Sequence, residues 1–173
     1  KFEVKTMSEE KALEIAGLVK EQREYFRTGA TLPVSVRKGY LQRLAKAIRI
    51  MEPDILKALT SDLGKSGVEG YMTEIGMTLS EITYMVKNMD RLARKKYKPT
   101  PLAQIPGVSY ELPVPYGVVL IMSPWNYPFL LSIDPLADAI AAGNTVILKP
   151  SAYSPNTSRI IEKIIKECFE PEF

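Results

Sequence analysis

The sequence predicts an α/β protein in which a helical amino-terminal segment precedes a strand, a helix and a second strand. Two apolar runs rich in β-branched residues, Val118–Met122 and Thr145–Leu148, have the length of strands buried on both faces. The apolar segment between them, Phe129–Ala142, has the length of a helix and ends at Gly143-Asn144, a helix stop signal. This order predicts a right-handed parallel crossover, the first βαβ part of a Rossmann-like parallel sheet.

Two amphipathic helices are expected in the first third of the chain. Residues 8–27 begin with Ser8 as a cap and end before Gly29. The expected apolar stripe of this helix is Leu13, Ala16, Leu18 and Val19. The second helix, Val36–Met51, has Ser35 as its predicted cap. Its apolar side chains at helical spacing are Val36, Tyr40, Leu41, Leu44, Ala47, Ile48 and Met51.

Two further helices are expected before residue 94. One starts at Pro53, which suits a first helical turn, and stops at Gly64. Ser66 and Glu69 have the spacing of a capping box that opens a long helix reaching about Ala93. Two glycines, Gly70 and Gly76, lie in the first turns of this helix, and each costs about 1 kcal/mol relative to alanine.

Helical periodicity changes to strand periodicity near residue 100, and we therefore divide the chain into residues 1–98 and 99–173. The basic run 91–98 is typical of a solvated helix end rather than a binding patch. The proline-rich stretch 98–106 predicts a linker. Alternating apolar residues then predict a strand, and an amphipathic helix is expected over 156–169. The alternating residues are Val108, Tyr110, Leu112 and Val114.

Composition excludes several classes of protein. The chain has 173 residues and a net charge of +3, which is too small to indicate nucleic acid or an anionic membrane as a partner. No apolar stretch is long enough to predict a membrane segment. The sequence has no histidine and one cysteine, Cys168. The lack of histidine excludes catalytic triads that need it. Because there is also no cysteine cluster, we expect no zinc site. We expect a cytoplasmic protein.

Polar residues follow both predicted strands of the crossover. Residues 123–126 come after the first strand, and residues 149–151 come after the second. Ligands of open α/β sheets bind outside the carboxyl ends of the strands. A G-x-G-x-x-G fingerprint is missing after the first strand, so these patterns alone predict only a ligand site of nucleotide-like type.

Two motifs resemble a known family. The chain reads P-x-G-V-V-L-I-x-S-P-W-N-Y-P over residues 115–128 and A-A-G-N-x-V-I-L-K-P-S over residues 141–151. This pattern resembles the amino-terminal signature of the aldehyde dehydrogenase superfamily. The spelling W-N-Y-P and its spacing resemble the sequences of the class 3-like branch, which acts on fatty or aromatic aldehydes. The resemblance implies an incomplete aldehyde dehydrogenase fold, in which residues 99–173 are the first part of the NAD(P)-binding domain. It also implies an aldehyde substrate, NAD or NADP as cofactor, and a homodimer or homotetramer when full length.

The resemblance gives Asn126 a catalytic role. Oxidation of an aldehyde through a cysteine thiohemiacetal develops negative charge on the former carbonyl oxygen, and a fixed amide donor stabilises that charge. The asparagine of W-N-Y-P supplies this donor in the resembled family. Outside the motif, a turn asparagine would be the simpler interpretation of Asn126.

The resemblance also implies a cofactor site. The lysine of K-P-S, Lys149, is expected to bind the adenosine ribose hydroxyls or a 2′-phosphate, with Ser151 beside it. The main chain expected to line the cofactor cleft belongs to Met122, Ser123, Pro124 and Trp125. Ala152 departs from many NAD-preferring relatives, which carry glutamate at this position. Because alanine does not repel a 2′-phosphate, we expect the full-length enzyme to tolerate or prefer NADP.

Three other side chains are of interest. Tyr127 follows Asn126 and is a candidate to flank the aldehyde tunnel. Tyr71 lies in Y-x-x-E-I, which resembles a segment that lines the substrate funnel in class 3-like members. Simple aromatic packing is the alternative for both tyrosines. Cys168 lies near the end of an ordinary helix and outside the family's cysteine motif, so it is not expected to be the nucleophile. The nucleophilic cysteine and the general-base glutamate are expected beyond residue 173, which predicts that this polypeptide alone is inactive.

Two alternatives remain open on the sequence. One is an acylating or semialdehyde-phosphate reductase relative with the same architecture. The other is a non-catalytic nucleotide-binding fragment that acts as a partner subunit.

Overall fold

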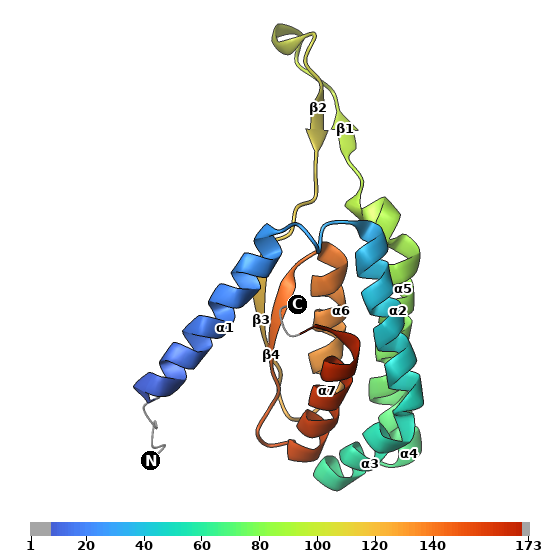
Figure 1. The fold of residues 1–173 in the computed structure, drawn as a ribbon. Coiled ribbons are helices and arrows are strands. Elements are labelled where there is room, and N and C mark those ends of the chain that lie inside the picture. The colour runs from blue at the N-terminus through green and yellow to red at the C-terminus, as the bar shows by residue number, and fades with distance from the viewer. Residues whose placement is uncertain (1–7, 171–173) are drawn as a thin grey trace, which may run out of the picture.

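A parallel pair of strands joined by a helix is the centre of the molecule, as predicted. In the computed structural model, which describes residues 8–170, β3 (Val118–Met122) is followed by α6 (Leu130–Ala142) and β4 (Thr145–Lys149). The strands pair in parallel register from Val118↔Thr145 to Met122↔Lys149. Among the described residues this pair forms a sheet of its own (Figure 1).

Helices form two layers on one side of this strand pair (Figure 1). The inner layer is α6 with α7 (Pro155–Cys168), and the outer layer contains α2 (Val34–Ile50) and α5 (Gly76–Ala93). One hydrophobic core runs through these layers, and its fully buried side chains include Leu44, Ile48, Ile82, Ile133, Ile140 and Ile161. Core side chains therefore come from both sides of residue 98.

The end of α6 shows how the amino-terminal half is joined to the crossover. Gly143 takes φ +94°, a left-handed conformation that favours glycine and ends the helix as predicted. The guanidinium of Arg37 donates to the carbonyl of Ala141 at 2.7 Å, and the hydroxyl of Thr31 donates to the carbonyl of Gly143 at 2.7 Å. Carbonyls that the helix leaves without partners are thus satisfied by side chains from α2 and the turn before it.

The predicted long helix after Ser66 is present, with a π-helical turn inside it. Its parts are α4 (Gly67–Gly70), a π turn (Tyr71–Ile75) and α5, and α3 (Glu52–Leu63) precedes them and ends at Gly64 as expected. Ser66 Oγ accepts a hydrogen bond from the Glu69 N–H at 3.2 Å, which confirms the serine half of the capping box. Gly70 and Gly76, the two glycines expected to weaken this helix, flank the π turn.

The start of α2 differs from the prediction. The helix begins at Val34 after Pro33, so Ser35 lies inside the first turn and is not the cap. The Pro33 carbonyl accepts hydrogen bonds from the N–H groups of Val36 and Arg37, so the first turn closes without a side-chain cap. The predicted inward face is confirmed, except that Val36 is 37% exposed.

The strand β3 is not buried on both faces, contrary to the prediction. Ile121 faces the helices and is buried, whereas Leu120 and Met122 point to the other face and are 57% and 69% exposed. The helix α1 (Glu9–Arg27) contacts this strand pair but covers only part of that face (Figure 1).

The helix α1 has its predicted bounds and cap but not its predicted buried stripe. Ser8 Oγ accepts a hydrogen bond from the Lys11 N–H at 3.4 Å. Leu13 and Leu18 are 73% and 40% exposed, because the first turns extend away from the strands (Figure 1), whereas Gln22 in the second half of the helix is 3% exposed.

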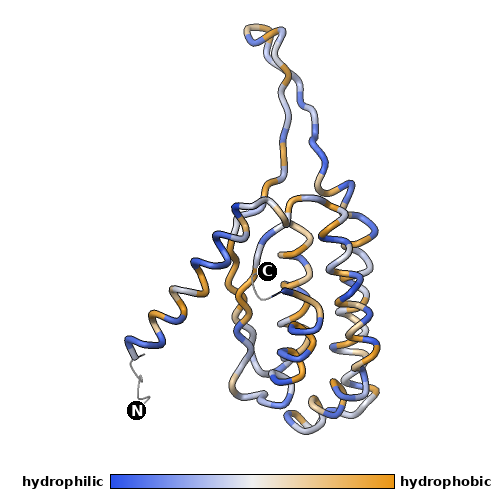
Figure 2. The backbone as a smooth tube through the Cα atoms, in the orientation of Figure 1, coloured by the Kyte–Doolittle hydropathy of each residue, from blue (hydrophilic) through white to orange (hydrophobic). Residues whose placement is uncertain are grey.

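The segment predicted as a linker over 98–106 is part of a β-hairpin. Strand β1 (Lys96–Lys98) pairs antiparallel with β2 (Ser109–Glu111). The strand β2 is shorter than the predicted strand, whose alternating residues extended to Val114. A 3-10 turn (Leu102–Gln104) lies near the tip of the hairpin. The prolines that predicted a linker lie in the tip, where no ladder hydrogen bond is needed. The hairpin projects from the body, and apolar and hydrophilic residues alternate along it (Figure 2).

Within residues 8–170, no helix combines the length and the apolar character needed to cross a membrane.

Candidate functional site

Both strands of the crossover end at one edge of the sheet, and the two predicted site loops leave from it. Met122 lies opposite Lys149 in the register, and the Ser123 N–H donates to the Lys149 carbonyl at 3.2 Å. The W-N-Y-P loop and the K-P-S turn therefore start side by side, as the carboxyl ends of parallel strands require.

The W-N-Y-P loop is held at its start by two buried serines. The hydroxyls of Ser123 and Ser132 are 2.6 Å apart, and the Ser132 hydroxyl also lies 2.6 Å from the Pro128 carbonyl, to which it donates. Because Ser132 has one hydroxyl proton, Ser123 is the donor between the two serines. These bonds tie the end of β3 to the first turn of α6.

The side chains at the crest of this loop are exposed. Trp125 is 54% and Tyr127 is 40% exposed, and Asn126 is also exposed. The Asn126 carboxamide makes no hydrogen bond to any residue within the described range 8–170, so its donor N–H groups are available to a ligand.

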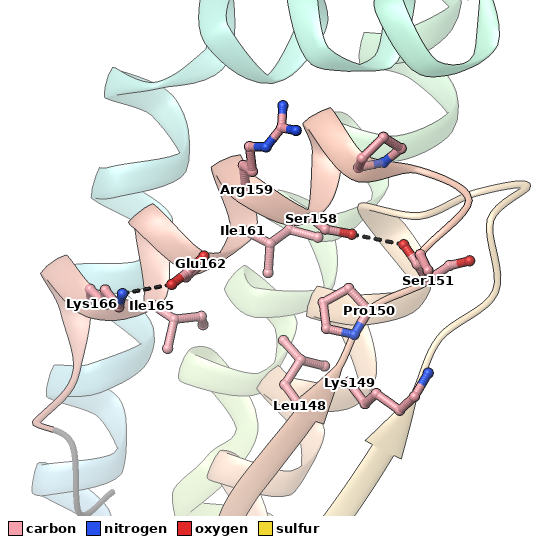
Figure 3. A pocket seen from close by; sticks show the side chains of 12 residues that line it. Leu148, Lys149, Pro150, Ser151, Ser158, Arg159, Ile161, Glu162, Ile165 and Lys166 are labelled. Carbon is pink, nitrogen blue, oxygen red and sulfur yellow. Dashed lines mark hydrogen bonds and ion pairs between the residues drawn. The ribbon is translucent and has the colours of Figure 1, made fainter. Parts of the chain in front are cut away.

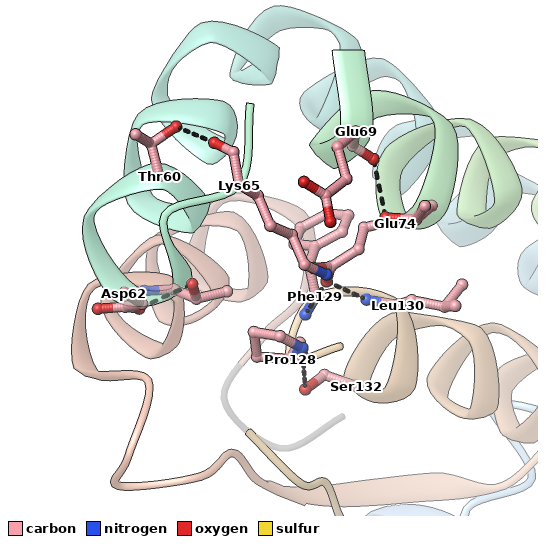
Figure 4. A network of polar contacts seen from close by, with 11 residues as sticks. Thr60, Asp62, Lys65, Glu69, Glu74, Pro128, Phe129, Leu130 and Ser132 are labelled. Atoms are coloured by element: carbon pink, nitrogen blue, oxygen red, sulfur yellow. Dashed lines mark hydrogen bonds and ion pairs between the residues drawn. The ribbon is translucent and has the colours of Figure 1, made fainter. Parts of the chain in front are cut away.

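Two buried charges support the far end of the loop (Figure 4). Glu74, in the π turn, is fully buried, and its Oε2 accepts hydrogen bonds from the N–H groups of Phe129 at 2.8 Å and Leu130 at 3.2 Å. Its Oε1 is 2.5 Å from Nζ of Lys65, whose side chain is 8% exposed. The Lys65 ammonium also lies 3.9 Å from the centre of the Tyr127 ring.

A cavity of about 750 Å³ lies between the end of β4 and α7 (Figure 3). Its apolar walls include Leu148, Pro150, Ile161 and Ile165. Its charged side chains are Lys149, Arg159, Lys166 and one carboxylate, Glu162. Lys166 pairs with Glu162 at 2.6 Å and Arg159 donates to Asn156, whereas the Lys149 ammonium has no ion pair or hydrogen bond to the rest of residues 8–170. The cavity combines an apolar lining with excess positive charge.

The start of α7 is fixed by a carboxylate from α3. Asp62 accepts hydrogen bonds from the N–H groups of Asn156 and Thr157 at 3.2 and 2.7 Å, and from both of their side chains at 2.7 and 2.8 Å. Burial raises the pKa of Asp62, but these four hydrogen bonds together outweigh burial and hold the pKa below its ordinary value. Asp62 thereby places the α7 wall of the cavity against the amino-terminal helices.

The structure brings only some of the predicted cofactor residues into the cavity. Lys149, Ser151 and Ala152 line it, although the Ser151 hydroxyl also accepts a hydrogen bond from the Tyr153 N–H at 3.2 Å. Four predicted residues lie at the same edge without lining this cavity: Met122, which ends β3, and Ser123, Pro124 and Trp125, which follow it. Tyr71 is 41% exposed on the π turn, three residues before Glu74.

Cys168 lies at the opposite end of α7 from this edge (Figure 1). It is 2% exposed, and burial raises the pKa of its thiol to about 11, since the attraction of Arg43 is the smaller effect. A thiol in this state is a poor nucleophile, which agrees with the sequence expectation.

Sequence reasoning missed Asp62, Lys65 and Glu74 because nothing local distinguishes them from solvated charges. Glu74 stands beside an apolar stripe, and its partners at residues 129 and 130 are more than fifty positions away. Arg159 was missed for a similar reason, because the positive charge of the cavity depends on where α7 packs.

The fold defines an α/β protein with a parallel βαβ unit, and the loop of Asn126 and the side chain of Lys149 lie at the carboxyl edge of that unit. The model of the aldehyde dehydrogenase family matches residues 2–172, and the chain belongs to that family.

Curated relatives and a solved structure agree with this assignment. The chain is 46% identical over 153 residues to 4,4'-diaponeurosporen-aldehyde dehydrogenase of Staphylococcus aureus, covering 88% of this chain and 33% of that protein. It is 38% identical over 154 residues to aldehyde dehydrogenase family 3 member A2 of Rattus norvegicus, covering 89% and 32%. A structure of the substrate-bound state of Staphylococcus aureus AldH superposes with a TM-score of 0.89 at 45% identity, covering 92% of this chain and 35% of that chain. The chain therefore spans about a third of the length of these relatives, and the predicted resemblance to the class 3-like branch is confirmed.

Proposed function

We propose that this chain is the amino-terminal part of an aldehyde dehydrogenase that oxidises an aldehyde to a carboxylic acid with NAD(P)+ through a cysteine thiohemiacetal. The observation that carries the proposal is the shared edge, where the loop of Asn126 and the ammonium of Lys149 follow neighbouring parallel strands. The nucleophilic cysteine and the general-base glutamate would belong to the remainder of the enzyme.

Asn126 would act on the reacting oxygen. Its carboxamide is exposed and has no hydrogen-bond partner among residues 8–170, while the loop that carries it is anchored on both sides. A donor that is fixed in this way stabilises developing negative charge without the cost of reorganising water.

The cavity beside β4 fits the adenosine end of a dinucleotide. Lys149 offers an unpaired ammonium, and the apolar walls can hold a flat base. When bound, the nicotinamide would supply the hydride acceptor. Use of NADP is supported by Ala152, which puts no carboxylate at the mouth, and by Arg159, which adds a second cation that can meet a 2′-phosphate.

Turnover by the full-length protein that contains this chain tests the proposal. NAD and NADP reduction would be followed with hexanal and benzaldehyde as fatty and aromatic probes. Asn126→Ala is expected to lower kcat by roughly 10²–10³, because one oxyanion donor is lost. Asn88→Ala, at a half-buried asparagine on α5, is the matched control and should leave kcat unchanged.

Other outcomes would contradict parts of the proposal. An unchanged kcat in Asn126→Ala removes the catalytic assignment. Strict use of NAD removes the NADP assignment. Reduction of acyl substrates in place of acid formation would favour the acylating relative, and absence of any turnover would favour a non-catalytic subunit.

We also infer that the full-length protein associates with copies of itself as a homodimer or homotetramer. The support is the projecting hairpin, whose exposed apolar side chains include Tyr97, Leu102, Ile105, Val108 and Tyr110. An isolated two-stranded hairpin is marginal in water, and burial against a second copy would stabilise it. The cytoplasmic location stays a prediction.

A further inference from the structure

Lys65 and Glu74 form a buried ion pair that the proposed chemistry does not use (Figure 4). Taking two charges out of water costs several kcal/mol per ion, so a buried pair is weak evidence for stability. The geometry of this pair instead connects it to the W-N-Y-P loop at two points.

Glu74 provides the cap that α6 lacks within its own sequence. The helix begins at Leu130 after Phe129, and Phe129 has no side chain that can accept a hydrogen bond. The first N–H groups of a helix need acceptors when they are buried. Glu74 Oε2 meets two of them, and its negative charge suits the positive end of the helix dipole.

Lys65 contacts both the carboxylate and the loop. Its ammonium lies 2.5 Å from Glu74 Oε1 and 3.9 Å from the centre of the Tyr127 ring, a cation–π distance. The pair thus touches the residue directly after Asn126 and the backbone three and four residues after it. The serine pair holds the loop from the other side.

We propose that Glu74, oriented by Lys65, is a positioning residue that sets the direction of the Asn126 carboxamide. Because Asn126 has no hydrogen bond to the rest of residues 8–170, only the backbone of its loop can aim it. The inference rests on the proposed function, since the orientation of the Asn126 carboxamide affects the rate only if this group donates a hydrogen bond to the reacting oxygen. Displacement of a catalytic group by about 1 Å can cost roughly 10² in rate.

The π turn connects the Glu74 carboxylate to Tyr71, a candidate substrate residue. Tyr71 and Glu74 belong to the same turn, so one element carries a candidate tunnel residue and the carboxylate that anchors the oxyanion loop. Single π turns inside helices are frequent at functional sites. Glu74 therefore couples the position of this turn to that of Asn126.

Glu74→Gln in the full-length enzyme is the test. Glutamine keeps the size of the side chain but has only one acceptor oxygen, so it cannot accept from Lys65 and from the N–H groups of Phe129 and Leu130 at the same time. We expect kcat to fall about 10- to 100-fold, with little change in the KM for NAD or NADP. Asp90→Asn, which breaks the exposed ion pair between α5 and Lys38, is the matched control and should leave kcat unchanged.

A double-mutant cycle separates aiming from general stability. If Glu74 acts through Asn126, then Glu74→Gln costs no further rate in an Asn126→Ala background. Equal rate losses in the two backgrounds would overturn the proposal, as would an unchanged kcat in Glu74→Gln. If Glu74→Gln does not fold, the pair Lys65→Met with Glu74→Gln, which leaves no unpaired buried charge, takes its place.

Hydrogen exchange tests the anchor without catalysis. The peptide covering residues 123–131 should exchange faster in Glu74→Gln than in wild type or Asp90→Asn, because two backbone N–H groups lose their ionic acceptor. Unchanged exchange would overturn the positioning role. If this peptide exchanges faster in Glu74→Gln but the wild-type protein turns over no aldehyde, the anchor stands and only the proposed function is refuted.

Discussion

At the scale of single residues, the most informative groups are two carboxylates that cap helices far away in the sequence. Asp62 caps α7, and Glu74 caps α6. Both come from the helical half of the chain, and both act on a helix that follows a strand of the parallel pair. Each therefore sets the position of one of the two site loops.

The ionisation of Asp62 predicts a pH dependence of stability. The native pKa lies below the unfolded value of about 3.9, so the stabilisation is present above pH 4 and is lost as pH falls through the native pKa. Asp62→Asn should lower the thermal midpoint at pH 7, corresponding to about 1–2 kcal/mol, and the difference from wild type should shrink as the pH falls below 4. Thermal unfolding at pH 7 and over a series of acidic pH values measures this effect, and a difference that does not shrink would refute it.

At the scale of elements, side chains from the amino-terminal half form hydrogen bonds with both ends of α6. Glu74 satisfies the N–H groups at its start, and Arg37 and Thr31 satisfy carbonyls at its end. Gly143 completes this end with a positive φ. The position of α6 relative to β3 and β4 thus depends on side chains that lie outside the βαβ unit.

Two glycines should respond in opposite ways to alanine. Gly143→Ala places a Cβ at φ +94° and 3.4 Å from the Thr31 carbonyl, so it should destabilise the protein by more than about 1 kcal/mol. Gly39→Ala, inside α2 with nothing within 4 Å of the new Cβ, should stabilise it by about 0.5–1 kcal/mol. Thermal or denaturant unfolding distinguishes the signs, and two shifts in the same direction would contradict the argument.

At the scale of the whole molecule, one hydrophobic core joins the helical half to the crossover, while the hairpin lies outside it. The core contains side chains from α2, α3 and α5 together with those from α6 and α7. The hairpin projects from this body (Figure 2), and its large apolar side chains are exposed. The division at residue 98 stays a prediction, because a shared core neither requires nor forbids it.

The exposed hairpin predicts the effect of charge at its tip. Leu102 and Val108 are 87% and 67% exposed, so aspartate at either position should weaken self-association of the full-length protein while leaving its thermal midpoint nearly unchanged. Ile50→Asp, at a 67% exposed position at the end of α2, is the matched control. Sedimentation velocity measures the change, and an unchanged oligomer in both hairpin variants would locate the interface elsewhere.

The sequence by itself determined the βαβ unit, most helix bounds and the family, because apolar periodicity, Gly stops and two continuous motifs are local signals. Only the tertiary structure decided which faces are covered, as the exposed Leu120 and Leu13 illustrate, since burial depends on what packs against a face. It also decided that residues 96–111 form a hairpin and that Lys65, Glu74 and Asp62 support the site loops. A carboxylate caps a helix that is distant in the sequence only when folding places the N–H groups of that helix beside it, and the local sequence does not reveal this pairing.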